Sequence, residues 1–211
     1  MSVNPFADPA LATNYEAWYE TVGRRADRLE KALLRRLLAG FPQARSALEV
    51  GCGTGHFTRW LGTQNLHVIG LDLSSAMLQE AIRLGSPACV RGNALALPFP
   101  NSAFDLVVLI TALEFIPDPV QALAEAIRVS RYGLILGVLN RQSLLTWRLK
   151  RSGLALWQVA RFFTPAELAD LARRAGGKRL KVNWRTTLWP LWSGDCSLPW
   201  GGFIGMAVKL S

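Results

Sequence analysis

Short apolar runs alternate with amphipathic stretches along most of this chain. Seven short runs are predicted as strands, at residues 46–50, 67–74, 88–94, 104–111, 132–140, 178–189 and 203–210. The run at 104–111 is almost continuously apolar, which is typical of a central strand in a parallel sheet buried on both faces. The last two runs are expected to form an antiparallel pair.

Apolar residues between these runs recur at helical spacing. Helices are predicted at residues 13–22, 24–40, 56–61, 75–84, 117–130 and 164–175. In the second of them Leu29, Leu33 and Leu37 share one face, as in an amphipathic helix. Thr164 and Glu167 form the capping-box pattern of a helix start. The first twelve residues show neither pattern and are predicted to be a loose arm.

The alternation of strand and helix signals predicts an α/β fold. At 211 residues the chain is long enough for one sizeable core and short for two domains. We therefore expect residues 1–211 to form a single doubly wound, Rossmann-like sheet. Its seven strands should be mostly parallel, with an antiparallel last strand.

A loop rich in glycine follows the first predicted strand. Gly51, Gly53 and Gly55 stand at alternate positions, and glycines let the backbone turn sharply and approach a ligand. The N-terminus of the next helix favours an anionic group. The loop thus predicts a nucleotide-type cofactor site. A dinucleotide fingerprint fits poorly, because its third glycine would stand at His56.

An acidic residue ends the second predicted strand. Asp72 lies about twenty residues past Gly51, where a nucleotide site keeps a carboxylate for the ribose hydroxyls. A carboxylate can accept hydrogen bonds from both hydroxyls at once. A capping role is the weaker interpretation, since Ser74 and Ser75 already supply caps.

Four motifs resemble the class I S-adenosylmethionine (SAM)-dependent methyltransferases. The string E-x-G-x-G-x-G, which begins at Glu49, resembles motif I of that family. The string GNALALPFPNSAFD at 92–105 resembles the branch called methyltransferase type 11, as does RFFTPAEL at 161–168. The pattern Y-x-x-W-[FY]-E at 15–20 resembles the N-terminal helix of small-molecule methyltransferases. The resemblance covers most of residues 13–175.

This resemblance implies SAM as the cofactor, S-adenosylhomocysteine as the product, and methyl transfer to a small molecule by in-line displacement. The cofactor-binding residues expected from it and from the loop pattern are Glu49, Gly51, Cys52, Gly53, Gly55, Asp72, Leu73, Met77, Asn93, Ala94, Leu95 and Thr111. Met77 is expected to pack on the adenine. Asn93 stands where family members usually carry Asp, which accepts from the adenine amino group. Asn can accept there too, but it brings two donors and no charge.

The resemblance also divides the chain into a helical cover at 13–40, a cofactor-binding core at 46–140 and a substrate lid at 141–163. Candidate acceptor-binding residues are Tyr15, Tyr19, Trp147 and Arg148. Glu114 follows the fourth predicted strand and is the candidate general base. A salt bridge to a nearby arginine is its alternative role.

The net charge of +9 is unevenly distributed. The stretches 24–45 and 141–185 are strongly basic, while 46–140 is slightly acidic. Basic flanks favour an anionic substrate, a nucleic acid or a membrane surface, although solvated helix faces explain them equally well. Tryptophans and arginines in 141–163, and tryptophans around 190–199, could grip a planar anionic or aromatic acceptor, stack on bases, touch lipid headgroups, or pack on one another.

Other features narrow the class of protein. Cys52, Cys89 and Cys196 are an odd number without a C-x-x-C pair, so neither a disulfide framework nor a metal site is expected. Neither a membrane-spanning run nor a signal pattern is evident, and a cytoplasmic location is expected. The alternatives are a nucleic-acid methyltransferase, a non-catalytic SAM-binding protein and an NAD-dependent reductase.

Overall fold

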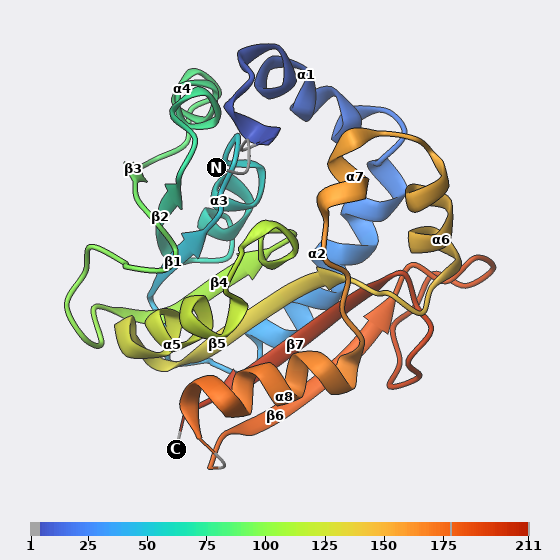
Figure 1. The fold of residues 1–211 in the computed structure, drawn as a ribbon. Helices are drawn as coiled ribbons and strands as arrows, with labels where there is room; N and C mark the ends of the chain where they lie inside the picture. Colours follow the sequence, from blue (N-terminus) through green and yellow to red (C-terminus); the bar gives the residue numbers. More distant parts are fainter. Residues whose placement is uncertain (1–4, 178, 211) are drawn as a thin grey trace.

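The computed structural model describes residues 5–177 and 179–210 (Figure 1). The strands are β1 (Ser46–Val50), β2 (His67–Asp72), β3 (Cys89–Arg91), β4 (Phe104–Ile110), β5 (Ser130–Leu139), β6 (Lys181–Thr187) and β7 (Phe203–Lys209). The helices are η1 (Pro5–Ala7), α1 (Pro9–Glu20), α2 (Arg24–Leu38), α3 (His56–Gly62), α4 (Ser75–Arg83), η2 (Leu113–Phe115), α5 (Pro119–Val129), α6 (Leu144–Arg151), α7 (Ala155–Val159) and α8 (Pro165–Gly176).

The strands form one sheet in the order β3-β2-β1-β4-β5-β7-β6. Neighbours from β3 to β5 are parallel, whereas β7 runs antiparallel to both β5 and β6. The predicted mostly parallel sheet with an antiparallel last strand is confirmed. The strand order reverses between β1 and β4, and ligands of open α/β sheets bind at such a reversal.

Two hydrophobic cores lie on opposite faces of this sheet. Helices α2 and α3 pack on one face, where Leu33 and Phe57 meet Leu106 of β4. Helices α5 and α8 pack on the other face, where Leu123 and Leu168 join the same core. Because side chains alternate along a strand, β4 packs apolar side chains on both faces, and all of its residues are buried, including Asp105 near its start.

The N-terminal segment is more regular than its sequence predicts. The expectation of a loose arm is wrong for residues 5–12, which form η1 and the start of α1; residues 1–4 lie outside the described residues. Asp8 caps α1 by accepting from the backbone N–H of Ala10 at 2.8 Å. The hydroxyl of Ser74 donates to the carbonyl of Phe6 at 2.6 Å, which holds η1 against the start of α4.

Element boundaries shift where one element follows another directly. β5 begins at Ser130, two residues earlier than predicted, because α5 ends at Val129 without a loop. β3 is shorter than predicted. The capping box at Thr164 is confirmed, with both reciprocal hydrogen bonds to Glu167 present. No helix among the described residues is both long enough and apolar enough to cross a membrane.

Candidate cofactor and acceptor site

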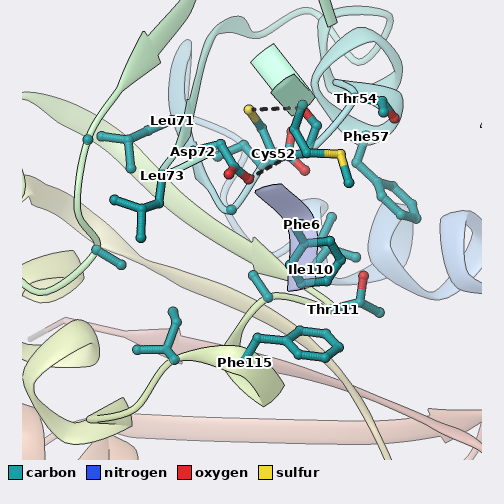
Figure 2. Close-up of a pocket in the computed structure, with 18 of the residues that line it drawn as sticks. Phe6, Cys52, Thr54, Phe57, Leu71, Asp72, Leu73, Ile110, Thr111 and Phe115 are labelled. Carbon is teal, nitrogen blue, oxygen red and sulfur yellow. Dashed lines mark hydrogen bonds between the residues drawn. The ribbon is translucent and has the colours of Figure 1, made fainter. Parts of the chain in front are cut away.

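A cavity of about 420 Å³ lies at the carboxyl ends of the parallel strands. Figure 2 shows Leu71, Asp72 and Leu73 on one side of it, with Phe6 and Phe115 across from them. The wall continues through the glycine loop, the loops after β3 and β4, helix α1 and the last residue of α7. This is where the strand order predicts a ligand.

The glycine loop takes a left-handed path that only glycine adopts easily. Gly51, Gly53 and Gly55 have φ of 75°, 53° and 77°. A Cβ on Gly51 would lie 2.4 Å from the Cβ of Ala112, so the loop approaches the turn after β4 too closely for any side chain. A Cβ on Gly53 would meet nothing within 4 Å, and Gly53 lines the cavity. Its backbone is therefore open to a ligand.

Asp72 holds the loop from the end of β2. Its Oδ2 accepts from the backbone N–H of Gly53 at 2.9 Å, and its Oδ1 accepts from that of Ser74 at 2.8 Å. Burial raises the pKa of Asp72, against the opposing effect of these hydrogen bonds. Each carboxylate oxygen keeps a second lone pair for a ligand hydroxyl. The side chain is thus fixed in position and still able to accept.

Glu49 is a buried acid on the cavity wall. The hydroxyl of Thr58 donates to its Oε2. Burial raises the pKa of Glu49 to about 8, although the Thr58 hydrogen bond and the charge of His56 oppose that rise. A buried carboxyl with a raised pKa is well suited to meet a ligand cation, because a cation restores the charged form.

Apolar side chains flank the far side of Asp72. Leu73, Met77 and Leu95 line the cavity there, and Met77 is almost fully buried. Asn93 also lines it, but its Oδ1 accepts from the backbone N–H of Leu95 at 2.9 Å. One of the two lone pairs of that oxygen is therefore engaged in shaping the loop.

Aromatic side chains enclose the other end of the cavity. Tyr15 and Tyr19 come from α1, Phe6 from η1 and Phe115 from η2. The rings of Phe6 and Phe115 meet edge to face at 4.8 Å between centroids. Burial raises the pKa of Tyr15 to about 12, so its hydroxyl stays protonated at neutral pH. This end of the cavity is aromatic, with neutral hydroxyl groups and with the ring of His56 stacked on Tyr19.

Glu114 does not lie on the wall of this cavity. Its Oε1 accepts from the backbone N–H of Leu139 at 2.7 Å, while its Oε2 is buried with no hydrogen-bond partner among the described residues. Burial raises the pKa of Glu114 to about 7. No salt bridge of this side chain occurs in the part of the chain that the structure describes.

A charged network that the sequence did not reveal joins α1 to the glycine loop. Glu16 of α1 accepts from the hydroxyl of Thr54 at 2.7 Å, pairs with Arg59, and lies 3.2 Å from Nδ1 of His56. The Nε2 of His56 lies 2.6 Å from Oδ1 of Asp27 in α2. Burial would lower the pKa of His56, but its hydrogen bonds to the two acids raise it instead. We call these residues the helix clamp.

The structure brings together most of the residues that the sequence predicts for the site. Those on the wall are Glu49, Gly51, Cys52, Gly53, Asp72, Leu73, Met77, Asn93, Ala94, Leu95, Thr111, Tyr15 and Tyr19. Gly55, Glu114, Trp147 and Arg148 are absent from it. Trp147 and Arg148 lie exposed on α6 instead, because that helix turns this face to solvent.

Two thiols lie next to the glycine loop. Cys89 pairs with Gly70 across the sheet, and the Sγ of Cys52 lies only 2.8 Å from where a Cβ on Gly70 would stand. Both cysteines are free. Their contact lowers the pKa of Cys89 to about 7, and together with burial it raises that of Cys52.

The chain is similar to known methyltransferases in sequence and in fold. A family model described as a methyltransferase domain, type 11, matches residues 48–136. A crystal structure from Thermotoga maritima, described as a SAM-dependent methyltransferase and possible histamine N-methyltransferase, is 29% identical with a TM-score of 0.80. The match covers 96% of this chain and 98% of that one.

Two curated relatives differ in how far they match. An uncharacterized protein of Methanocaldococcus jannaschii is 28% identical over 81% of this chain and 80% of its own length. The demethylmenaquinone methyltransferase of Shouchella clausii is 41% identical over 42% of this chain and 41% of its own length. The match to the second relative therefore covers less than half of that protein's length.

Proposed function

We propose that this chain, a SAM-dependent methyltransferase with a type 11 methyltransferase domain, methylates a small molecule. We further propose that this methyl acceptor is uncharged and either aromatic or apolar. The observation that carries the proposal is the composition of the cavity wall. Five aromatic residues line it, whereas no lysine or arginine does among the described residues. An anionic acceptor, which the basic flanks favoured, would meet one basic side chain on the described wall, His56, whose two ring nitrogens already face Glu16 and Asp27.

The residues on the wall fit the cofactor. SAM carries an ammonium and a sulfonium, two neighbouring ribose hydroxyls and a flat adenine. Glu49 offers a buried carboxyl for a cation, and Asp72 offers two oxygens for the hydroxyls. Leu73 and Met77 offer apolar surface for the adenine, and Gly53 leaves open space beside its backbone. We propose these roles for them, with the loop from Asn93 to Leu95 closing the adenine side.

When bound, SAM supplies a methyl group already activated by the positive charge of its sulfur. The chain's own task is then to orient the acceptor in line with that methyl group and to exclude water. Tyr15, Tyr19 and Phe115 enclose the acceptor end, and the helix clamp fixes α1 above the glycine loop. Positioning and desolvation therefore account for catalysis without a dedicated acid or base.

Glu114 lies behind this wall, and we propose that it positions the segment around η2. Its carboxylate accepts from Leu139 of β5, and its main-chain carbonyl accepts from the N–H of Arg161 at 2.8 Å. The Glu114→Gln variant keeps an oxygen for Leu139, so its kcat should fall by less than about threefold with an unchanged pH profile. A loss above about a hundredfold, together with loss of a pH midpoint near 7, would restore the general-base role.

Two relatives widen the range of acceptors to screen. One is described as acting on demethylmenaquinone and another as a possible histamine N-methyltransferase. Hydroquinones, phenols, aromatic amines and aromatic carboxylates should therefore be compared with SAM as donor. We expect turnover with neutral aromatic acceptors and little with the carboxylates.

Two variants test whether the acceptor binds in this cavity. Phe115→Ala, on the wall, should raise KM for a soluble acceptor by about tenfold or more. Trp147→Ala, an exposed residue outside the cavity, is the matched control and should leave KM unchanged. Turnover confined to carboxylates, or to RNA with strong salt dependence, would refute the proposal.

A further inference from the structure

We propose that a face on the lid side of the molecule docks on an anionic lipid bilayer. The face is formed by residues 144–159, which contain α6 and α7, and by the β6–β7 loop at 188–200. We call it the tryptophan face. It carries eight of the twelve large hydrophobic side chains that are exposed among the described residues. The most prominent are Trp147, Leu154, Leu191, Trp192, Leu198 and Trp200.

The two segments of the tryptophan face are fixed to one another. The side-chain amide of Asn140 donates to the carbonyls of Pro199 and Gly201 at 2.6 and 2.7 Å. Leu145 of α6 lies so close to Gly202 that a Cβ there would stand 2.9 Å from it. In Figure 1 α6, α7 and the β6–β7 loop lie on the same side of the molecule.

The loop is also held from the side of α2. The guanidinium of Arg25 donates to the carbonyls of Trp189 and Trp192 at 2.9 and 3.3 Å. The backbone of this loop is thus anchored at several points, while its apolar side chains face outward. The exposure of these side chains is therefore a property of an anchored backbone and does not arise from a detached loop.

The exposed side chains protrude, which suits insertion into an interface. Leu191 is fully exposed at 101%, and Trp192 and Trp147 are about half exposed at 50% and 53%. Protein partners usually require pockets for their anchoring side chains, whereas a bilayer accepts protruding ones. Tryptophan prefers the headgroup level of a membrane because its ring is apolar and its N–H is polar.

The charge of the face complements an anionic membrane. Residues 141–166 contain five Lys or Arg residues and no Asp or Glu. Lys150 and Arg151 are exposed on the last turn of α6, and Arg151 lies over the ring of Trp147 at 4.4 Å. Asp195, the acid of the β6–β7 loop, pairs with Arg185 and Arg36. Cations beside exposed tryptophans are the combination that anionic headgroups attract.

The face adjoins the mouth of the cavity. Val159 at the end of α7 is 64% exposed and also lines the cavity. Trp157 of the same helix contacts Phe115 of the cavity wall, with ring centroids 6.5 Å apart. A bilayer bound to the tryptophan face would therefore lie beside the entrance, where an apolar acceptor can pass directly from lipid to protein.

Vesicle flotation tests this docking directly. The full chain is mixed with vesicles of phosphatidylcholine alone, or with about one third phosphatidylglycerol, at low and at high salt. We expect binding to the anionic vesicles at low salt, and weak binding to the neutral ones or at high salt. Light scattering of the protein without vesicles should show the same oligomeric state for every variant.

Paired variants test whether vesicle binding depends on the tryptophan face or on the rest of the surface. Lys150→Gln with Arg151→Gln should weaken binding by about 25-fold, at about fivefold per cation. The matched control, Arg173→Gln with Arg174→Gln in the last turn of α8, should change it less than about twofold. Leu191→Ser with Trp192→Ser should weaken binding about tenfold or more, while Ile82→Ser, an exposed residue of α4, should not.

Several results would overturn the proposal. These are no binding of the native chain to anionic vesicles, equal losses in the face and control variants, or a dimer that the Leu191/Trp192 variant dissociates. SAM titration of each variant confirms that the site is intact. Because vesicle binding needs no methyl transfer, failure of the proposed acceptor class would leave this test unaffected.

Discussion

Binding of SAM should release a proton from Glu49. Burial raises the pKa of this carboxyl to about 8, so at pH 7 about nine in ten molecules carry the proton. A ligand cation placed against the carboxyl favours the charged form and drives the proton off. The Glu49→Gln variant stays neutral at this position at every pH and should lose the part of the proton release and of the pH dependence that Glu49 contributes.

The magnitude follows from the raised pKa. We expect release of about 0.9 proton per site at pH 7 and about 0.5 at pH 8. If the ionised carboxyl alone binds the cation, the Kd for SAM should fall about 50-fold between pH 6 and pH 8. In Glu49→Gln, SAM should bind weakly with a nearly constant Kd over this range.

Isothermal titration calorimetry measures this release. Titrations in buffers of different ionisation enthalpy, such as phosphate and Tris, give the number of protons released from the slope of the observed enthalpy. Glu30→Gln is the matched control, because Glu30 is also buried with a pKa raised to about 8 but does not line the cavity. His56 lines the cavity as well, and its contribution remains in the Glu49 variant.

Protein stability provides a second measure with a definite sign. The folded pKa of Glu49 exceeds its ordinary value of 4.5. Its contribution to stability is therefore fully present below about pH 4.5 and is lost as the pH rises through about 8. SAM should offset that loss. Zero proton release at pH 7 in the native chain, or an unchanged release in Glu49→Gln, would refute the assignment of Glu49 to the ligand cation.

Three further predictions concern the glycine loop and its neighbours. Gly53→Ala should cost about 1 kcal/mol of unfolding free energy, because φ there is 53°, and should weaken SAM binding at least about tenfold by calorimetry. Asn93→Asp should tighten SAM binding about fivefold or more, since the charged oxygen can still accept from Leu95 N–H while it meets a ligand donor. The rate of Cys89 alkylation by iodoacetamide should have a pH midpoint near 7. The Cys52→Ala variant should move that midpoint upward toward the ordinary thiol value. An unmoved midpoint would show that the two thiols do not interact.

The sheet was predictable because its signals are local. Each strand is a short run whose apolar character reflects burial on one or both faces, and β4 is the clearest case. The alternation of these runs with helices predicted a mostly parallel, doubly wound sheet, and the structure supplies the order of its strands. The loose-arm prediction failed at residues 5–12 because η1 and the first turn of α1 are too short to show a period, and their contacts, such as Ser74 to Phe6, are with distant residues.

The site was predictable where it is built from consecutive residues. Asp72 ends a strand, and the glycine loop and the loop from Asn93 to Leu95 each follow one, so their place at the carboxyl edge is fixed by the strand itself. Trp147 and Arg148 were predicted in the site because residues 141–163 are rich in tryptophan and arginine. The spacing of these residues does not reveal which face of a lid helix is turned toward the cavity. Glu114 illustrates the same limit, since its 3-10 turn directs the carboxyl away from the cavity wall.

The helix clamp shows why the cover of the site escaped prediction and what it contributes. Its contacts join residues far apart in the chain, such as Glu16 with Thr54 and His56 with Asp27, and no local pattern encodes such pairs. The clamp acts on the glycine loop itself, because Thr54 and His56 directly follow Gly53 and Gly55. We therefore expect that a ligand which fixes the loop also stabilises the position of α1 against it.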